Sequence, residues 1–116
     1  MNELKIYHNP RCSKSRETLK LIINKKLSPK IIHYLDEKLT FKEVNLLLDL
    51  LQLTPRSLLR SEEVEYRNNN LKDPKISDDE IINYMIQFPK LIQRPIVING
   101  KKAIIGRPPE NVLKIL

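Results

Sequence analysis

The chain has 116 residues, of which 41% are hydrophobic and 30% are charged, and it carries a formal net charge of +7. This length and composition are typical of an ordinary globular chain that forms one domain, here residues 1–116, and they exclude a low-complexity protein. The positive charge permits nucleic-acid binding, but the lysines are scattered and only 5% of the residues are aromatic, so we expect no nucleic-acid surface.

The beginning of the chain predicts a βαβ unit. Residues 4–7 alternate between apolar and polar side chains as in a strand, and residues 13–26 carry apolar side chains at helical spacing. A second apolar run, residues 30–34, follows Ser28-Pro29. Because strands joined by a crossover helix run in the same direction, we expect these two strands to be parallel.

The middle of the chain, residues 40–89, predicts a helical block. Thr40 to Glu43 and Ser77 to Glu80 both have the spacing of a capping box, and an apolar pattern with helical period follows each. Pro55 suits the first position of a further short helix. These signals predict that helices make up this region.

The end of the chain predicts a hairpin and a last helix. Asn99-Gly100 lies between two apolar runs and fits the central positions of a type I′ turn. A helical pattern begins near Pro108. The element order βαβ, helices, ββα predicts an α/β, thioredoxin-like fold, with a mixed four-stranded sheet and flanking helices. Its core would be residues 1–39 and 90–116, and residues 40–89 would be a helical insertion.

Some kinds of site and location do not fit the sequence. One cysteine and two separated histidines give no zinc-ligand spacing, and there is no glycine-rich phosphate loop. The N-terminus lacks the apolar core of a signal peptide, and Asp49 interrupts the densest apolar run, residues 46–51. We therefore expect a cytoplasmic protein with no bound metal and no contact with a membrane.

Cys12 is the candidate reactive residue, because it lies between the first predicted strand and the N-terminus of the first predicted helix. The free N–H groups and the dipole of a helix N-terminus stabilise an anion, and cationic neighbours lower the pKa of a thiol. Many lone cysteines are inert core residues, but the polar and basic neighbours of Cys12 do not suit a core. A single thiol cannot form an internal disulfide, so redox chemistry at Cys12 would need a thiol from another molecule.

Three further polar residues have two interpretations each. Ser15 occupies the place of the second cysteine in a Cys-X-X-Cys motif, so its hydroxyl could bond the Cys12 thiolate or could cap the helix. His8 ends the first strand, where it could exchange a proton with Cys12 or bond to backbone. His33 lies inside the predicted second strand, and we expect it to be structural.

Four segments, in this order and spacing, resemble one known family over nearly the whole chain. They are His8 with Asn9 to Arg16, Leu58 to Arg60, Arg94 to Ile96, and Gly106 to Pro108. Together they resemble the glutaredoxin-linked arsenate reductase family.

The resemblance implies a thioredoxin-like arsenate reductase with Cys12 as the nucleophile, His8 assisting the thiolate, and Pro95 as a cis-proline facing the cysteine. It also implies three oxyanion ligands, which are Arg60, Arg94 and Arg107. Planar guanidinium groups suit the oxygens of a tetrahedral dianion, so this assignment makes chemical sense.

The route implied by the resemblance begins when Cys12 attacks arsenate to form a thiol-arsenate adduct. Glutathione, a co-substrate, then attacks and arsenite leaves, and glutaredoxin reduces the remaining glutathione-Cys12 disulfide. No bound cofactor is expected. Two alternatives stay open: a general glutathione-dependent thiol oxidoreductase without arsenate activity, and an Spx-type regulator that binds RNA polymerase. Ser15 removes the Cys-X-X-Cys switch typical of such regulators.

Overall fold

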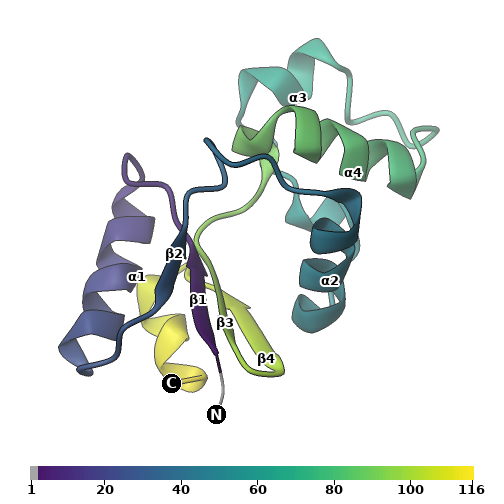
Figure 1. Ribbon diagram of the computed structural model, residues 1–116. Coiled ribbons are helices and arrows are strands. Elements are labelled where there is room, and N and C mark those ends of the chain that lie inside the picture. Colours follow the sequence, from purple (N-terminus) through teal and green to yellow (C-terminus); the bar gives the residue numbers. More distant parts are fainter. Residues whose placement is uncertain (1–2) are drawn as a thin grey trace. The chain divides into compact units, whose positions relative to one another are not determined.

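A mixed four-stranded sheet organises the two ends of the chain in the computed structural model, which describes residues 3–116 (Figure 1). The strands are β1 (Leu4–Tyr7), β2 (Lys30–Ile32), β3 (Ile96–Asn99) and β4 (Lys102–Ile105), in the spatial order β2-β1-β3-β4. β1 pairs in parallel with β2 and antiparallel with β3, and β3 pairs antiparallel with β4. The predicted thioredoxin-like sheet is confirmed.

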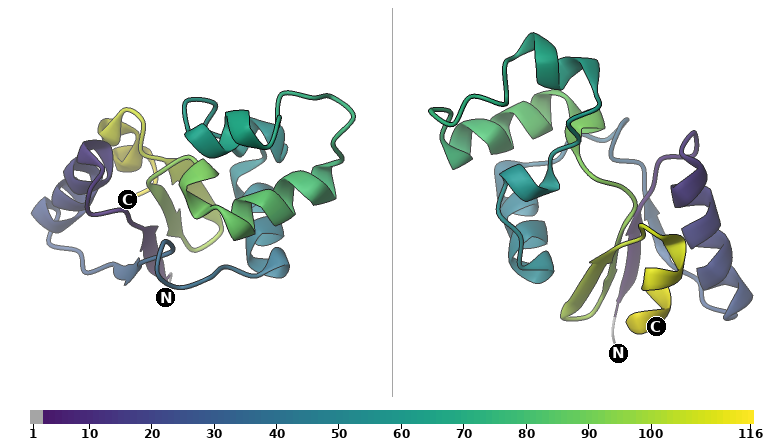
Figure 2. Two further views of the ribbon diagram at one scale, coloured as in Figure 1. Left: turned by 90° about the horizontal axis from the view of Figure 1, so that it is seen from above. Right: turned by 180° about the vertical axis from the view of Figure 1, so that it is seen from behind.

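Two helices pack against each other beside this sheet. α1 (Ser13–Asn24) connects β1 to β2, and the 3₁₀ helix η3 (Pro109–Lys114) contacts α1, as the two further views show (Figure 2). The core between sheet and helices contains four fully buried side chains, those of Ile6, Ile22, Val97 and Val112. Because Ile6 and Val97 are opposite each other in the β1–β3 register, one sheet face supplies the apolar surface that the helices cover.

The hairpin between β3 and β4 differs from the prediction by one residue. Asn99 pairs with Lys102, so Gly100 and Lys101 are the two turn residues. Gly100 has a φ of 64°, and Lys101 is not among the described non-glycine residues with positive φ. Glycine at the first central position with positive φ is typical of a type II′ turn, so the type I′ assignment was wrong, although the hairpin itself is present.

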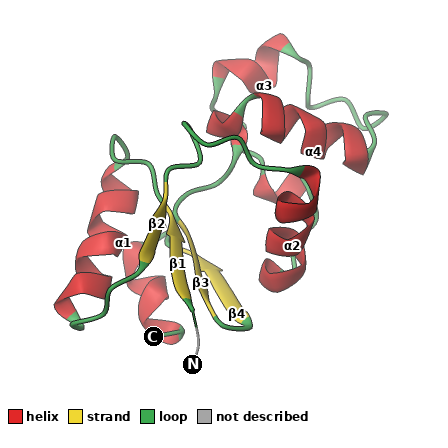
Figure 3. Cartoon of the chain, viewed as in Figure 1, coloured by secondary structure: helices red, strands yellow, loops and turns green. Residues whose placement is uncertain are grey.

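The chain divides into two compact units, of which the second is Lys38–Gln93; residues 1–37 and Arg94–Leu116 make up the first. Helices and loops build the second unit (Figure 3). Its helices are α2 (Phe41–Leu51), η1 (Arg56–Leu58), α3 (Val64–Asn68), α4 (Asp78–Gln87) and η2 (Pro89–Leu91). The sequence placed the insertion at residues 40–89.

Both predicted capping boxes are present in the second unit. The Thr40 hydroxyl accepts the N–H of Glu43, and the Ser77 hydroxyl accepts the N–H of Glu80, while each glutamate accepts the N–H of its capping residue. An isolated antiparallel bridge joins Leu59 to Ile92. Within residues 3–116, no helix is long and apolar enough to cross a membrane.

Candidate active site around Cys12

The loop between β1 and α1 holds Cys12 at the helix N-terminus. Asn9 closes this loop, because its carbonyl accepts the N–H of Cys12 at 3.0 Å and its Oδ1 accepts the N–H of Arg11 at 3.0 Å. Cys12 is the N-cap residue of α1, with extended backbone (φ −95°, ψ 122°). Sequence reasoning did not single out Asn9; the signal for it is that asparagine side chains bond the backbone two residues further on.

The environment of Cys12 favours its thiolate. Burial raises the pKa of the Cys12 thiol, but the backbone N–H groups of Ser15 and Lys14 and the guanidinium of Arg94 outweigh burial, so the pKa lies below its ordinary value. No capping hydrogen bond of ordinary geometry reaches the Cys12 side chain. The backbone N–H groups of the first turn of α1 still favour the negative charge on the sulfur.

Arg107 is placed directly at the sulfur. Its Nη2 lies 3.5 Å from Cys12 Sγ, and its Nε donates to the carbonyl of Arg94 at 2.8 Å. The side chain of Asn111 donates to the carbonyl of Arg107 at 3.1 Å. The Nε bond holds one edge of the guanidinium on the backbone and leaves Nη2 facing the thiol, while the Asn111 bond holds the backbone of Arg107. The structure thus brings together two of the predicted oxyanion ligands, Arg94 and Arg107, with Cys12.

Gly106 allows β4 to approach α1 and Pro95 closely. A Cβ at this position would lie 2.5 Å from Thr18 Oγ1 and 2.9 Å from Pro95 Cγ, both shorter than real contacts. The N–H of Gly106 donates to the carbonyl of Pro95 at 2.9 Å, and the Arg94–Pro95 peptide bond is cis. Because Arg107 follows Gly106, this close approach also sets the place from which Arg107 reaches Cys12.

The hydroxyl of Ser15 bonds to His8 and Asn9. Ser15 Oγ lies 2.6 Å from His8 Nδ1 and accepts the N–H of Asn9 at 3.0 Å, and Ser15 is fully buried. The predicted bond from this hydroxyl to the Cys12 thiolate is not among the hydrogen bonds of the described residues. The group of Ser15 that favours the thiolate is its backbone N–H, and the structure connects His8 to Cys12 through Ser15.

His33 lies beside His8 and outside the strand that was predicted to contain it. β2 ends at Ile32, and the exposed His33 follows it. The two imidazole rings meet edge to face, with their centroids 6.2 Å apart. Burial lowers the pKa of His8, and the charges of His33 and Arg16 lower it further. The expectation that His33 is a strand residue was wrong.

Arg60, the third predicted oxyanion ligand, belongs to the second unit. Its backbone N–H donates to the carbonyl of Leu91 at 2.7 Å. Its guanidinium nitrogens lie 3.6 Å from a carboxylate oxygen of Glu62 and 3.6 Å from one of Glu63. These contacts describe Arg60 within its own unit, and its part in oxyanion binding stays a prediction.

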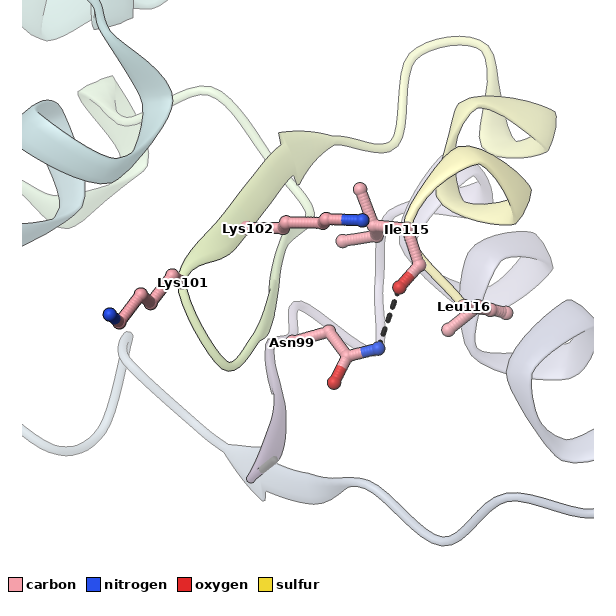
Figure 4. A pocket seen from close by; sticks show the side chains of 5 residues that line it. All are labelled: Asn99, Lys101, Lys102, Ile115 and Leu116. Atoms are coloured by element: carbon pink, nitrogen blue, oxygen red, sulfur yellow. Dashed lines mark hydrogen bonds between the residues drawn. The ribbon is translucent and has the colours of Figure 1, made fainter. Parts of the chain in front are cut away.

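An open pocket of about 500 Å³ lies beside the hairpin between β3 and β4 and the end of the chain (Figure 4). Its lining residues are Asn99, Lys101, Lys102, Ile115 and Leu116, and Asn99 Nδ2 donates to the carbonyl of Ile115 at 2.6 Å. β3 starts at Ile96, two residues after Arg94, whose guanidinium bonds to the Cys12 thiolate, and it ends at Asn99 on the pocket. The pocket is therefore separate from the thiol site.

Comparisons with known proteins extend over nearly the whole chain. The model of the family described as "ArsC family" matches residues 7–115. The chain is 44% identical to the uncharacterized protein YfgD of Escherichia coli K12, over 98% of this chain and 97% of that protein. It is 45% identical to an arsenate reductase of Haemophilus influenzae, over 96% and 97% respectively. An arsenate reductase structure from Vibrio cholerae superposes with a TM-score of 0.96 at 45% identity, covering 99% of this chain and 98% of that one.

Proposed function

Because the chain belongs to the ArsC family, we propose that it is an arsenate reductase in which Cys12 is the nucleophile. The observation that carries this proposal is the placement of a thiol with a lowered pKa 3.5 Å from the Nη2 of Arg107. A nucleophile and a cationic hydrogen-bond donor at one point suit an electrophile that carries negative oxygens.

Arginine beside the sulfur offsets the charge repulsion between the two reacting anions. A thiolate and an arsenate dianion repel each other, so the attack needs positive charge beside the sulfur. Arg107 and Arg94 supply that charge, and planar guanidinium groups bind such oxygens by paired, charge-assisted bonds. In this proposal Arg60 is a third ligand, as the sequence resemblance implies.

The electrons come from two thiols. The Cys12 thiolate forms a sulfur–arsenic bond as one arsenate oxygen leaves as water. The thiolate of glutathione then attacks the Cys12 sulfur, so a disulfide forms and the sulfur–arsenic bond breaks with its electron pair left on arsenic. Arsenite departs with arsenic reduced by two electrons, and glutaredoxin reduces the mixed disulfide by thiol exchange. This sequence uses no resident cofactor and takes glutathione as co-substrate.

A coupled assay tests the proposal. NADPH oxidation is followed with arsenate, glutathione, glutaredoxin and glutathione reductase, and each component is left out in turn. We expect oxidation to require arsenate, both thiol components and an intact Cys12, with Cys12→Ser as the control.

Two results would contradict the proposal. Oxidation that continues without arsenate but responds to added disulfides would favour a general thiol oxidoreductase. Arsenate reduction that proceeds without glutathione would refute the proposed electron donor and would leave the nucleophile in place.

A further inference from the structure

We propose that His33 is a positioning residue that keeps His8 neutral, so that His8 Nδ1 accepts a hydrogen bond from the buried hydroxyl of Ser15. His8 and His33 follow the same ends of the parallel strands β1 and β2, because the N–H of His8 donates to the carbonyl of Ile32 at 3.0 Å. Their rings meet edge to face at 6.2 Å between centroids. His8 is 6% exposed and His33 is exposed, so His33 is the one of the pair that water reaches readily.

The hydrogen bonds of Ser15 decide which form of His8 fits. Ser15 Oγ accepts the N–H of Asn9, so its O–H is free to donate to His8 Nδ1 at 2.6 Å. A protonated His8 would carry a hydrogen on Nδ1 and would donate to the same oxygen. The hydroxyl hydrogen of the fully buried Ser15 would then have no acceptor among the described residues, and a buried donor without a partner is unfavourable. The neutral imidazole with its hydrogen on Nε2 leaves Nδ1 free to accept the Ser15 hydroxyl, so the buried hydroxyl keeps its acceptor.

The charges around His8 favour the same form. Burial lowers the pKa of His8, and the positive charges that face it, His33 after β2 and Arg16 on α1, lower it further. Arg16 is itself held by a bond from Nη1 to the carbonyl of Pro10 at 3.0 Å. On the β3 side, the residue opposite Tyr7, which precedes His8, is the apolar Ile96.

Two acidic residues follow His33 in its own turn. The N–H groups of Asp36 and Glu37 both donate to the carbonyl of His33, at 3.0 and 2.9 Å. These bonds fix the backbone of His33 in the turn that follows β2. From this position a positive charge on His33 opposes a proton on His8.

Proton and nitrogen NMR of the histidine rings tests this directly, since nitrogen shifts distinguish the two neutral tautomers from the cation. In the wild-type protein we expect His8 as the neutral form with hydrogen on Nε2. In His33→Phe, which keeps a ring but no charge, and in His33→Gln, the titration midpoint of His8 should shift to higher pH. His33→Lys, which restores a charge, should return the midpoint toward the wild-type value.

Lys30→Gln is the matched control, because it removes an exposed positive charge at the other end of β2. It should shift the His8 midpoint less than either uncharged His33 variant. An unchanged midpoint in both uncharged variants, or an equal shift in the control, would overturn the proposal. If the variants do not fold, the wild-type tautomer decides alone: hydrogen on Nδ1 of neutral His8 would overturn it.

The role of His33 rests on the proposed function in one respect: a neutral His8 would serve to hold Ser15 in the turn that faces the Cys12 thiolate. The NMR samples contain no arsenate. If the arsenate assay fails but the titrations are as expected, the proposed function is refuted and the role of His33 stands. If the assay succeeds but the titrations are not as expected, only the role of His33 is refuted.

Discussion

Gly106→Ala should destabilise the first unit and disturb the thiol site together. The added methyl group would lie 2.5 Å from Thr18 Oγ1, 2.9 Å from Pro95 Cγ and 3.0 Å from Thr18 Cγ2. Two of these three contacts are with the Thr18 side chain, and the third is with the rigid ring of Pro95. Overpacking of this kind costs about 1–3 kcal/mol, which corresponds to a fall in Tm of roughly 4–12 °C for a chain of this size.

Thr18 makes the reasoning testable by a double-mutant cycle. Thr18→Ala alone removes the bonds from Oγ1 to the carbonyls of Lys14, at 2.7 Å, and Gly106, at 3.5 Å, so it should itself destabilise. In the double variant the methyl group meets only Pro95, so the loss should be smaller than the sum of the two single losses. Urea unfolding of the four proteins gives the coupling free energy, which should exceed about 0.5 kcal/mol for residues in contact.

The activity of the same proteins connects packing to the site. If the alanine displaces the backbone before Arg107, Gly106→Ala should raise the KM for arsenate, and Thr18→Ala should restore part of the loss in the double variant. Strictly additive free energies of unfolding would refute the close contact as the cause. A Gly106→Ala protein with wild-type stability and KM would refute the whole argument.

Further predictions concern the thiol, its neighbour and the arginines. Cys12→Ser should abolish arsenate reduction. Because folding lowers the pKa of Cys12, the thiolate should stabilise the wild-type protein relative to Cys12→Ser at pH values above the pKa of the unfolded thiol. This difference in stability should vanish as the pH falls through the lower pKa of the folded protein. The Tm of both proteins, measured against pH, checks it. Ser15→Ala should slow the reaction less than Cys12→Ser does, because it leaves the backbone N–H that faces the thiolate; equal losses by kcat would contradict this. Arg107→Lys should weaken oxyanion binding about tenfold or more, since a hydrogen bond to a charged group contributes roughly 1.5–3 kcal/mol; isothermal titration with arsenate measures it. The same titration of Arg60→Lys tests Arg60, and unchanged binding would remove it from the site.

Local patterns predicted most of the elements because they depend on short stretches of sequence. The capping boxes at Thr40 and Ser77 and the alternation in β1 are determined by residues a few positions apart. The hairpin was predicted, but its turn was placed one residue early, since Asn99 serves as the last residue of β3. The pairing of Asn99 with Lys102 sets the register of the hairpin, and this pairing cannot be read from the local sequence pattern.

For the thiol site, the sequence by itself determined that Cys12 stands at a helix N-terminus, that its pKa is lowered, and that no second thiol of this chain can assist it. These features follow from neighbours along the chain and from the composition. Only the tertiary structure decided that the Ser15 hydroxyl turns to His8, that His33 faces the same imidazole, and that Arg107 reaches the sulfur from 95 residues away in sequence. Such contacts depend on β1, β2 and β4 all ending at the same edge of the sheet, and side-chain direction at a strand end is set by packing across the sheet rather than by the local sequence.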